Sequence, residues 1–158
     1  MAENIPAHGG GLDPKNITYP KKGYRPLIIY ALQGIMQSVE WAVEIGDEFE
    51  PEFRALREEV REEILALARL LQQFGPQLGR PRVDTLNGSR HKNMKELRFA
   101  AAHGEWRVAF AFDPKRRAIL LVAGDKARGS QKRFYERLIV RADERFDAHL
   151  SRLKRERR

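Results

Sequence analysis

The chain has 158 residues, enough for one domain with a hydrophobic core but too few for two domains of ordinary size. It has no cysteine, which excludes disulfides, cysteine nucleophiles and cysteine-based zinc sites and favours a cytoplasmic location. The net charge of +8 favours an acidic partner, such as nucleic acid or an acidic protein. No segment holds the roughly 20 apolar residues of a membrane span, so we expect no membrane association.

Basic residues are concentrated in one part of the sequence. The segment Arg80–Arg133 contains 14 basic and 5 acidic residues, whereas Val39–Gly79 contains 4 basic and 10 acidic residues. This separation favours one positively charged face over an evenly charged surface. We therefore expect the functional surface to lie within Arg80–Arg133 and to bind an acidic partner.

The first 38 residues follow no helical or alternating pattern. They include Gly9–Gly11 and four prolines, which disfavour regular structure: Pro6, Pro14, Pro20 and Pro26. We predict that residues 1–38 form a disordered or loosely packed extension, and that Met36 could be the true translation start. The folded domain is predicted over residues 39–150.

The domain opens with a short strand and a long helical region. Trp41, Val43 and Ile45 alternate with less apolar residues, as in a half-buried strand. Apolar residues then recur at spacings of three and four up to Phe74, where Gly75 and Pro76 end the pattern. The pattern fits one helix or two helices with a bend. The basic stretch 77–93 that follows is predicted to be a loop.

Three strands and a final helix complete the domain. Apolar residues alternate with other residues before and after the turn Ala102–Gly104, which predicts two strands. The apolar run Ala118–Ala123 is predicted to form a third strand. The final helix begins near Gln131, and residues 151–158 form an exposed basic tail. This order implies an α+β fold, in which a small, twisted, mainly antiparallel sheet carries an N-terminal helical region and a C-terminal helix. One sheet face must be covered, and the other is free to be open.

Two arginines are predicted to face each other across the first hairpin. Pairing around the turn Ala102–Gly104 places Arg98 opposite Arg107 on the polar face, where like charges disfavour folding. Glu96 and Glu105 share this face and could neutralise the pair, which would make it structural. Alternatively, the two guanidinium groups form a clamp for phosphate, whose oxygens match their forked donors.

Metal-dependent nuclease chemistry is not expected. Carboxylates are scarce around the two arginines, although a two-metal nuclease needs several of them. The histidines also lack the spacing of metal ligands: His8, His91, His103 and His149. We therefore expect no metal and no cofactor.

Cleavage of RNA without a metal remains feasible, because the 2′-hydroxyl of RNA can attack the adjacent phosphorus. The protein then supplies a base, a proton donor and positive charge. His91, Lys126 and Tyr135 are candidates for proton transfer. Alternatively, His91 could be an ordinary surface residue, and Tyr135 could pack at the edge of the hydrophobic core. The candidate RNA-binding residues surround them: Arg90, Lys92, Lys95, Arg128, Lys132 and Arg133.

Five segments, in their order and spacing, carry a family resemblance: Leu86–Arg98, Trp106–Asp113, Ile119–Leu121, Gly124–Lys126 and Lys132–Tyr135. Together they resemble the phage-derived, HigB-like branch of the RelE/ParE toxin superfamily, and the likeness covers residues 39–150. The resemblance implies a RelE-like fold, a type II toxin–antitoxin toxin, mRNA cleavage usually on the ribosome, and a helix-turn-helix antitoxin as partner. By position it extends to Arg98, Arg107 and Lys126, whereas His91 and Tyr135 rest on chemistry alone.

Two other functions stay open. A ParE-like inhibitor of DNA gyrase is possible within the same superfamily, because one fold supports both activities. An inactive, toxin-like module that only binds a protein partner is the third reading. The arginines and the lysine on the sheet favour endoribonuclease activity.

Overall fold

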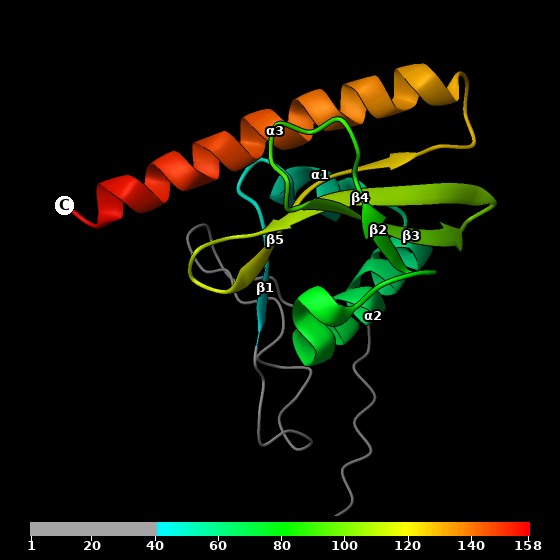
Figure 1. The fold of residues 1–158 in the computed structure, drawn as a ribbon. Coiled ribbons are helices and arrows are strands. Elements are labelled where there is room, and N and C mark those ends of the chain that lie inside the picture. Colours follow the sequence, from blue (N-terminus) through cyan, green and yellow to red (C-terminus); the bar gives the residue numbers. More distant parts are fainter. Residues whose placement is uncertain (1–40) are drawn as a thin grey trace, which may run out of the picture.

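A computed structural model describes residues 41–158 (Figure 1). Its elements, in chain order, are β1 (Ala42–Ile45), α1 (Glu50–Ala55), α2 (Glu58–Phe74), the 3-10 helix η2 (Gly75–Gln77), β2 (Val83–Thr85), β3 (Met94–Ala101), β4 (Gly104–Phe112), β5 (Arg117–Asp125) and α3 (Gln131–Glu156). The predicted α+β class is confirmed. The predicted extension over residues 1–38, with the start at Met36, lies outside the described residues.

The described residues form one five-stranded sheet, in the order β1-β5-β4-β3-β2. Only β1 and β5 in it are parallel, so the sheet is mainly antiparallel as predicted. The predicted loop over residues 77–93 was partly wrong, because it contains β2. That strand has three residues and only Val83 is buried, so it is too short to produce an alternating pattern.

The first hairpin has the predicted register. Arg98 pairs with Arg107, and Leu97 pairs with Val108 on the opposite face. The turn residues Ala102 and His103 have φ angles of 48° and 60°, in the left-handed region that favours glycine and asparagine. The chain therefore reverses within two residues, which fixes the cross-strand pairs.

The helical region over residues 51–74 is two helices. The chain is extended at Leu56 and Arg57, between α1 and α2. The Arg61 guanidinium donates hydrogen bonds of 2.8 Å to the carbonyl oxygens of Arg54 and Leu56. Because these carbonyls end α1, Arg61 satisfies acceptors that a continuous helix would have used internally.

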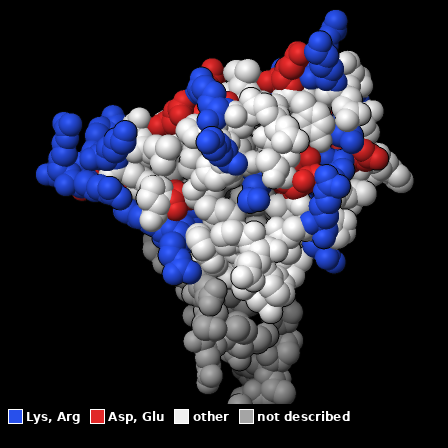
Figure 2. Space-filling model, in the orientation of Figure 1, with Lys and Arg blue, Asp and Glu red and all other residues white. Residues whose placement is uncertain are grey.

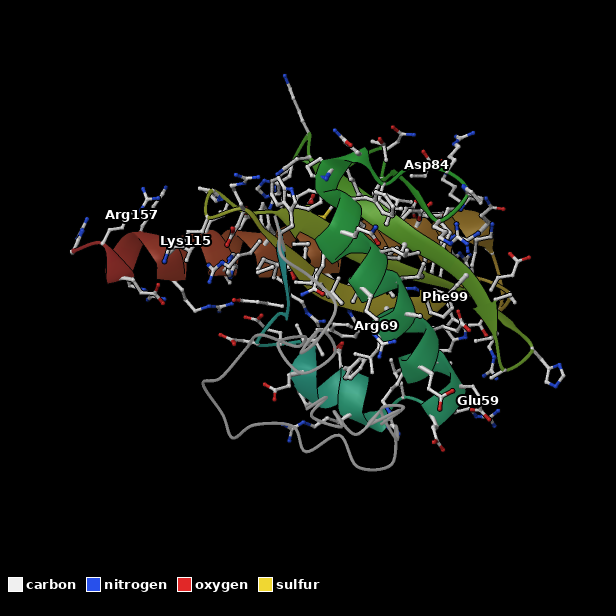
Figure 3. The ribbon with its side chains drawn as sticks, turned by 90° about the horizontal axis from the view of Figure 1, so that it is seen from below. Glu59, Arg69, Asp84, Phe99, Lys115 and Arg157 are labelled. Atoms are coloured by element: carbon white, nitrogen blue, oxygen red, sulfur yellow. The ribbon has the colours of Figure 1, made fainter. Side chains whose placement is uncertain are left out.

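Helices pack on both faces of the sheet, so neither face is fully open. On one side, α1 and α2 bury Phe53, Ile64 and Leu71 against the strands. On the other side, α3 buries Leu138 and Phe146 against β4 and β5. Seen from below, α2 crosses in front of the sheet and α3 lies behind it (Figure 3). None of the helices within residues 41–158 combines the length and apolarity needed to cross a membrane.

The last helix is longer than predicted. It continues through Glu156 and takes in most of the predicted tail, although Lys154–Arg158 are exposed as expected. Figure 2 shows a large group of Lys and Arg side chains at this C-terminal end of α3. His149 anchors the same half of the helix, because its Nε2 lies 2.9 Å from Oδ2 of buried Asp113.

Candidate active site

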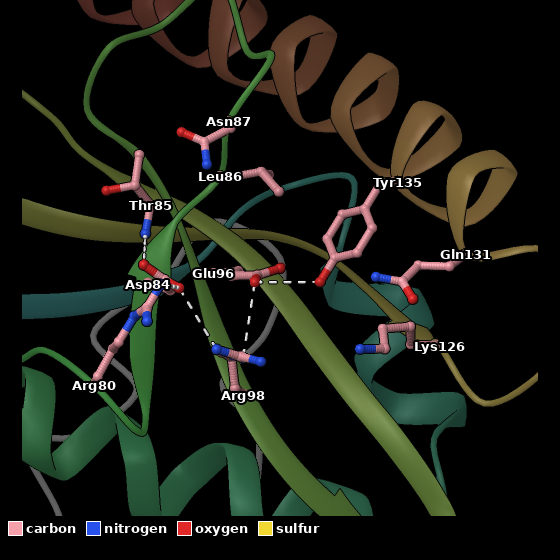
Figure 4. Close-up of a pocket in the computed structure, with 10 residues that line it drawn as sticks. All are labelled: Arg80, Asp84, Thr85, Leu86, Asn87, Glu96, Arg98, Lys126, Gln131 and Tyr135. Carbon is pink, nitrogen blue, oxygen red and sulfur yellow. Dashed lines mark hydrogen bonds and ion pairs between the residues drawn. The ribbon is translucent and has the colours of Figure 1, made fainter.

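A hollow opens on the α3 side of the sheet, beside the first turns of α3 (Figure 4). Its volume is about 480 Å³, within the range of ligand sites in proteins. Residues from β2, β3, α3 and the connecting loops line it: Arg80, Asp84, Thr85, Leu86, Asn87, Glu96, Arg98, Lys126, Gln131 and Tyr135. The hollow exists because α3 lies over β4 and β5, leaving polar residues of β2 and β3 uncovered.

The two facing arginines occupy different environments. The Arg98 side chain is 34% exposed and lines the hollow, where Nη1 lies 3.5 Å from Oδ2 of Asp84. The Arg107 side chain is only 7% exposed, and Nη1 donates a hydrogen bond of 2.8 Å to the carbonyl oxygen of Trp106. The two residues are therefore not equivalent arms of one clamp.

The glutamates that could neutralise the arginine pair do lie beside it. Glu96 Oε1 is 3.9 Å from Arg98 Nε, and Glu105 Oε2 is 4.0 Å from Arg107 Nη2. Repulsion between the arginines is thus compensated within the fold. This structural role does not remove Arg98 from the hollow, where its partly exposed guanidinium can bind an anion.

Tyr135 connects the sheet to α3 through its hydroxyl. Arg107 Nε donates to the hydroxyl oxygen at 3.3 Å, and the hydroxyl donates to Glu96 Oε1 at 3.2 Å. Burial raises the pKa of Tyr135, and the negative charge of Glu96 adds to this, while the hydrogen bond from Arg107 opposes it. Burial also raises the pKa of Glu96, against the hydrogen bond from Tyr135 and the charges of Arg107 and Arg98.

Lys126 reaches the hollow from the loop that follows β5. Its side chain is 18% exposed, and Nζ lies 3.6 Å from Oε2 of Glu105. Its backbone N–H donates to the Glu105 carbonyl oxygen at 2.6 Å, and Asp125 Oδ1 accepts from the backbone N–H groups of Glu105 and Ala127. The loop is thus tied to the β3–β4 hairpin, which holds the lysine beside the hollow.

His91 lies away from this site. Its Nε2 is 2.8 Å from Oδ1 of Asp147, and its ring packs edge-on against Phe146. Asp147 and Tyr135 are 12 positions apart on α3, roughly 18 Å along the helix axis. The neighbouring Arg90 also pairs with Asp147, while Lys92 is exposed in the same loop. These three predicted residues form a group separate from the hollow.

The remaining predicted RNA-binding residues are divided between the two sides of the sheet. Lys95 alternates with Glu96 on β3 and shares the α2 side with Leu97, so it points away from Arg98. Arg128, Lys132 and Arg133 are exposed in the loop before α3 and in its first turn. Their positions place them near Lys126 in the chain, at the end where α3 begins.

Carboxylates around the arginines are less scarce than predicted. The fold brings Asp84, Glu96 and Glu105 within 4.0 Å of an arginine of the pair. Sequence reasoning considered Glu96 and Glu105 only as neutralising charges, and it missed Asp84 because β2 was predicted to be a loop. The Glu-Leu-Arg sequence could have identified Glu96 as a site residue, because alternation along a strand places Glu96 on the same face as Arg98. Nothing in the sequence placed Gln131 at the site.

Asp84 belongs to a second ion pair at the edge of the hollow. Arg80 Nη2 lies 2.8 Å from Asp84 Oδ2. The hydrogen bond from Arg80 lowers the pKa of Asp84, together with the backbone N–H of Thr85 and the charges of Arg80 and Arg98. Among the described residues, no group of three or more histidines and carboxylates could hold a metal ion.

Comparison with known proteins gives one family and two relatives. The family model described as "Phage derived protein Gp49-like" matches residues 51–147. Two proteins of Mycobacterium tuberculosis (strain ATCC 25618 / H37Rv) are similar. "Putative toxin HigB2" is 42% identical over 85% of this chain, and "Putative toxin HigB3" is 46% identical over 63% of it. The match spans 66% of the length of the first relative and 84% of the second.

No solved structure matches the chain. The family model covers well over half of the sequence, including the hairpin with Arg98 and Arg107 and the start of α3 with Tyr135. The chain therefore belongs to the family of phage-derived Gp49-like proteins, which confirms the predicted resemblance to HigB-like toxins.

Proposed function

We propose that this chain is the toxin of a type II toxin–antitoxin system and a metal-independent endoribonuclease that cleaves mRNA on the ribosome. The observation that carries the proposal is the convergence of Arg98, Lys126 and Tyr135 on one hollow, although they come from three different segments of the chain. Together they offer a phosphate-binding cation, an ammonium group and a hydroxyl. Family membership supports the toxin assignment.

The proposed reaction is attack by the RNA 2′-hydroxyl on the adjacent phosphorus, which releases the 5′-oxygen of the next nucleotide. Arg98 binds the phosphate and offsets the charge that develops on it. The Tyr135 oxygen takes the 2′-hydroxyl proton as it gives up the hydroxyl proton that it already carries, and Lys126 donates a proton to the leaving 5′-oxygen. Arg107 acts through Tyr135, whose hydroxyl oxygen it contacts from the sheet. His91 has no assigned role in this reaction, because it lies away from the hollow.

Neutralisation by a helix-turn-helix antitoxin completes the proposal. A toxin that cleaves cellular mRNA requires control, and the family names of the relatives support an antitoxin as partner. Coexpression with such an antitoxin is expected to restore growth of cells that express this chain.

The test of this proposal is induction of the full chain in bacterial cells, with mRNA ends mapped and DNA supercoiling measured. We expect translation to stop and discrete mRNA cuts to appear, and Arg98→Ala to abolish both. Arg69→Ala is the matched control, because Arg69 is an exposed arginine on α2, on the opposite side of the sheet (Figure 3). Intact mRNA with defective supercoiling would instead support the gyrase-inhibitor function.

The chemistry is tested with a short mRNA in programmed ribosomes. Replacement of the ribose at the cut site by 2′-deoxyribose should prevent cleavage, because the attacking hydroxyl is then absent. The upstream product of the unmodified RNA should end in a 2′,3′-cyclic phosphate, measured by mass spectrometry. Cleavage of the 2′-deoxy RNA at the same position would rule out 2′-hydroxyl attack.

A further inference from the structure

Glu96 is a buried carboxylate at the base of the hollow, and the reaction above gives it no part. Its side chain is 7% exposed, although it lies among the residues that line the site. Oε1 accepts the hydrogen bond from Tyr135, whereas Oε2 is buried and receives no hydrogen bond from the described residues. Such a carboxylate carries a negative charge at a cost, because one oxygen has lost water without gaining a donor.

The hydrogen bonds around Tyr135 have a direction. Arg107 can only donate, since a guanidinium has no acceptor, so the Tyr135 oxygen accepts from it. The Tyr135 proton therefore points to Glu96 Oε1, 3.2 Å away. Figure 4 shows this hydroxyl and the Glu96 carboxylate turned toward each other at the hollow. The Tyr135 hydroxyl is thus oriented to give its proton to Glu96 while its oxygen accepts a proton from a bound substrate.

As a counterion of Arg98 alone, Glu96 is less well placed than Asp84. Its Oε1 is 3.9 Å from Arg98 Nε, whereas Asp84 lies closer to the same guanidinium, at 3.5 Å from Nη1. Asp84 is also less buried, so it neutralises Arg98 at a lower desolvation cost. The shorter contact of Glu96 is with Tyr135, which carries no charge to neutralise.

We propose that Glu96 is the final acceptor of the 2′-hydroxyl proton, which reaches it through Tyr135. The inference rests on the proposed function. As the P–O2′ bond forms and the P–O5′ bond breaks, the O2′ proton moves to the Tyr135 oxygen and the Tyr135 proton moves to Glu96 Oε1. Lys126 supplies a proton to O5′, and exchange with water then restores both side chains. Tyr135 touches the substrate in this scheme, and Glu96 acts through it.

The raised pKa of Glu96, which burial causes, agrees with this role. A carboxylate whose pKa lies above the usual value holds a proton more firmly and is a better base when ionised. Because the base must be ionised, the cleavage rate should rise with pH through the pKa of Glu96 and then level off. The acid side of the pH–rate profile is therefore the signature of Glu96.

The experiment measures single-turnover cleavage of mRNA in programmed ribosomes across pH, for the full chain and for variants at Glu96, Tyr135 and Glu136. Glu96→Gln keeps the shape and an acceptor for Tyr135 but cannot take a proton. We expect its rate to fall by about 100-fold or more and its acid limb to disappear. The double variant that combines Glu96→Gln with Tyr135→Phe should cleave no more slowly than Tyr135→Phe alone, because the proton relay is already broken. Glu136→Gln, an exposed carboxylate on the adjacent α3 residue, should leave rate and profile unchanged.

Several outcomes separate the relay from other roles. A Glu96→Gln rate within about threefold of the wild type, with the acid limb kept, would overturn the relay while leaving the endoribonuclease intact. Rate losses that multiply in the double variant would also overturn it. Absence of any cleavage by the wild-type chain would overturn both proposals. Chemical denaturation of each variant shows whether a rate loss comes from unfolding, and Glu96→Asp, which keeps the carboxylate, should restore the acid limb.

Discussion

The guanidinium Nε of Arg107 lies 3.3 Å from the hydroxyl oxygen of Tyr135, which holds this arginine against the tyrosine. Its cross-strand partner Arg98 lines the hollow instead. The strand register alone would make the two residues a symmetric pair. In the proposed reaction the two arginines accordingly have different roles, phosphate binding for Arg98 and support of proton transfer for Arg107.

Lysine substitutions should separate these two roles. Arg107→Lys removes the Nε contact with Tyr135, so we expect a loss of about 100-fold or more in cleavage rate with little change in RNA affinity. Arg98→Lys keeps the charge but loses the forked donors, so RNA affinity should fall as well. Fluorescence anisotropy with 2′-deoxy-substituted RNA measures affinity without cleavage. Equal losses of affinity in both variants would contradict the division of roles.

Salt dependence gives a second measure of Arg98. If Arg98 contacts one phosphate, Arg98→Ala should reduce the slope of log affinity against log salt by about 0.7, the value for single strands. Arg107→Ala should leave this slope unchanged, because its side chain is almost completely buried. A change of slope in the Arg107 variant would show that it too contacts phosphate.

Replacement of His91 should affect stability more than cleavage. The His91 ring contacts Asp147 and Phe146 and so fastens its loop to the middle of α3. We expect His91→Ala to lower the free energy of unfolding by about 1 kcal/mol and to keep the cleavage rate within about threefold. Tyr135→Phe, by contrast, should abolish most cleavage, and it should lower the free energy of unfolding by about 1–3 kcal/mol because Glu96 Oε1 loses its hydrogen bond. A rate loss in His91→Ala as large as that of Tyr135→Phe would give His91 a part in the reaction.

Gly124 controls how closely the start of α3 approaches the sheet. A Cβ atom at this position would lie 2.7 Å from Cε2 of Phe134. Gly124→Ala should therefore destabilise the fold by about 1–3 kcal/mol and shift Tyr135, which follows Phe134 in the helix. Phe134→Leu in the same chain should recover part of the stability, since leucine is smaller. Thermal unfolding and cleavage rate measure the two effects.

Asp113 makes the fold sensitive to acid. Burial alone would raise its pKa, but hydrogen bonds from His149 and Arg117 outweigh burial and lower the pKa to about 2. Because the unfolded value is 3.8, the stabilisation is complete above that pH and is lost as the pH falls toward 2. The shift corresponds to about 2 kcal/mol. Denaturation of Asp113→Asn should show this deficit near pH 5 and a smaller one near pH 2, while Glu136→Gln should show none.

Substitutions in the turn of the first hairpin should stabilise the fold. Ala102 and His103 both have positive φ, which costs residues with a Cβ atom about 1–2 kcal/mol each. Asn and Gly are the preferred pair for this kind of two-residue turn. We expect Ala102→Asn with His103→Gly to raise the free energy of unfolding by about 1–2 kcal/mol. Ala102→Val should lower it, because a β-branched residue fits this conformation poorly.

The sequence alone determined the parts of this protein that depend on local patterns. Alternation along β3 and β4, joined by a two-residue turn, was enough to place Arg98 opposite Arg107, because pairing across a tight turn depends on neighbours in the chain. The same alternation placed Glu96 on their face. Two differences were also local. β2 was too short to show a period, and beyond Leu153 the last turn of α3 consists of exposed charged residues that show no apolar spacing.

Only the tertiary structure decided which of these residues lie together. Glu96 and Tyr135 are 39 positions apart, and their contact depends on how α3 packs across the sheet. The same packing places His91 beside Asp147 rather than beside the hollow. A pattern of side chains fixes the face on which a residue lies, but the neighbours that it meets there come from distant segments. Arg107, which the strand register alone would place in a phosphate clamp, contacts the Tyr135 hydroxyl for the same reason, and the proposed reaction assigns it the support of Tyr135.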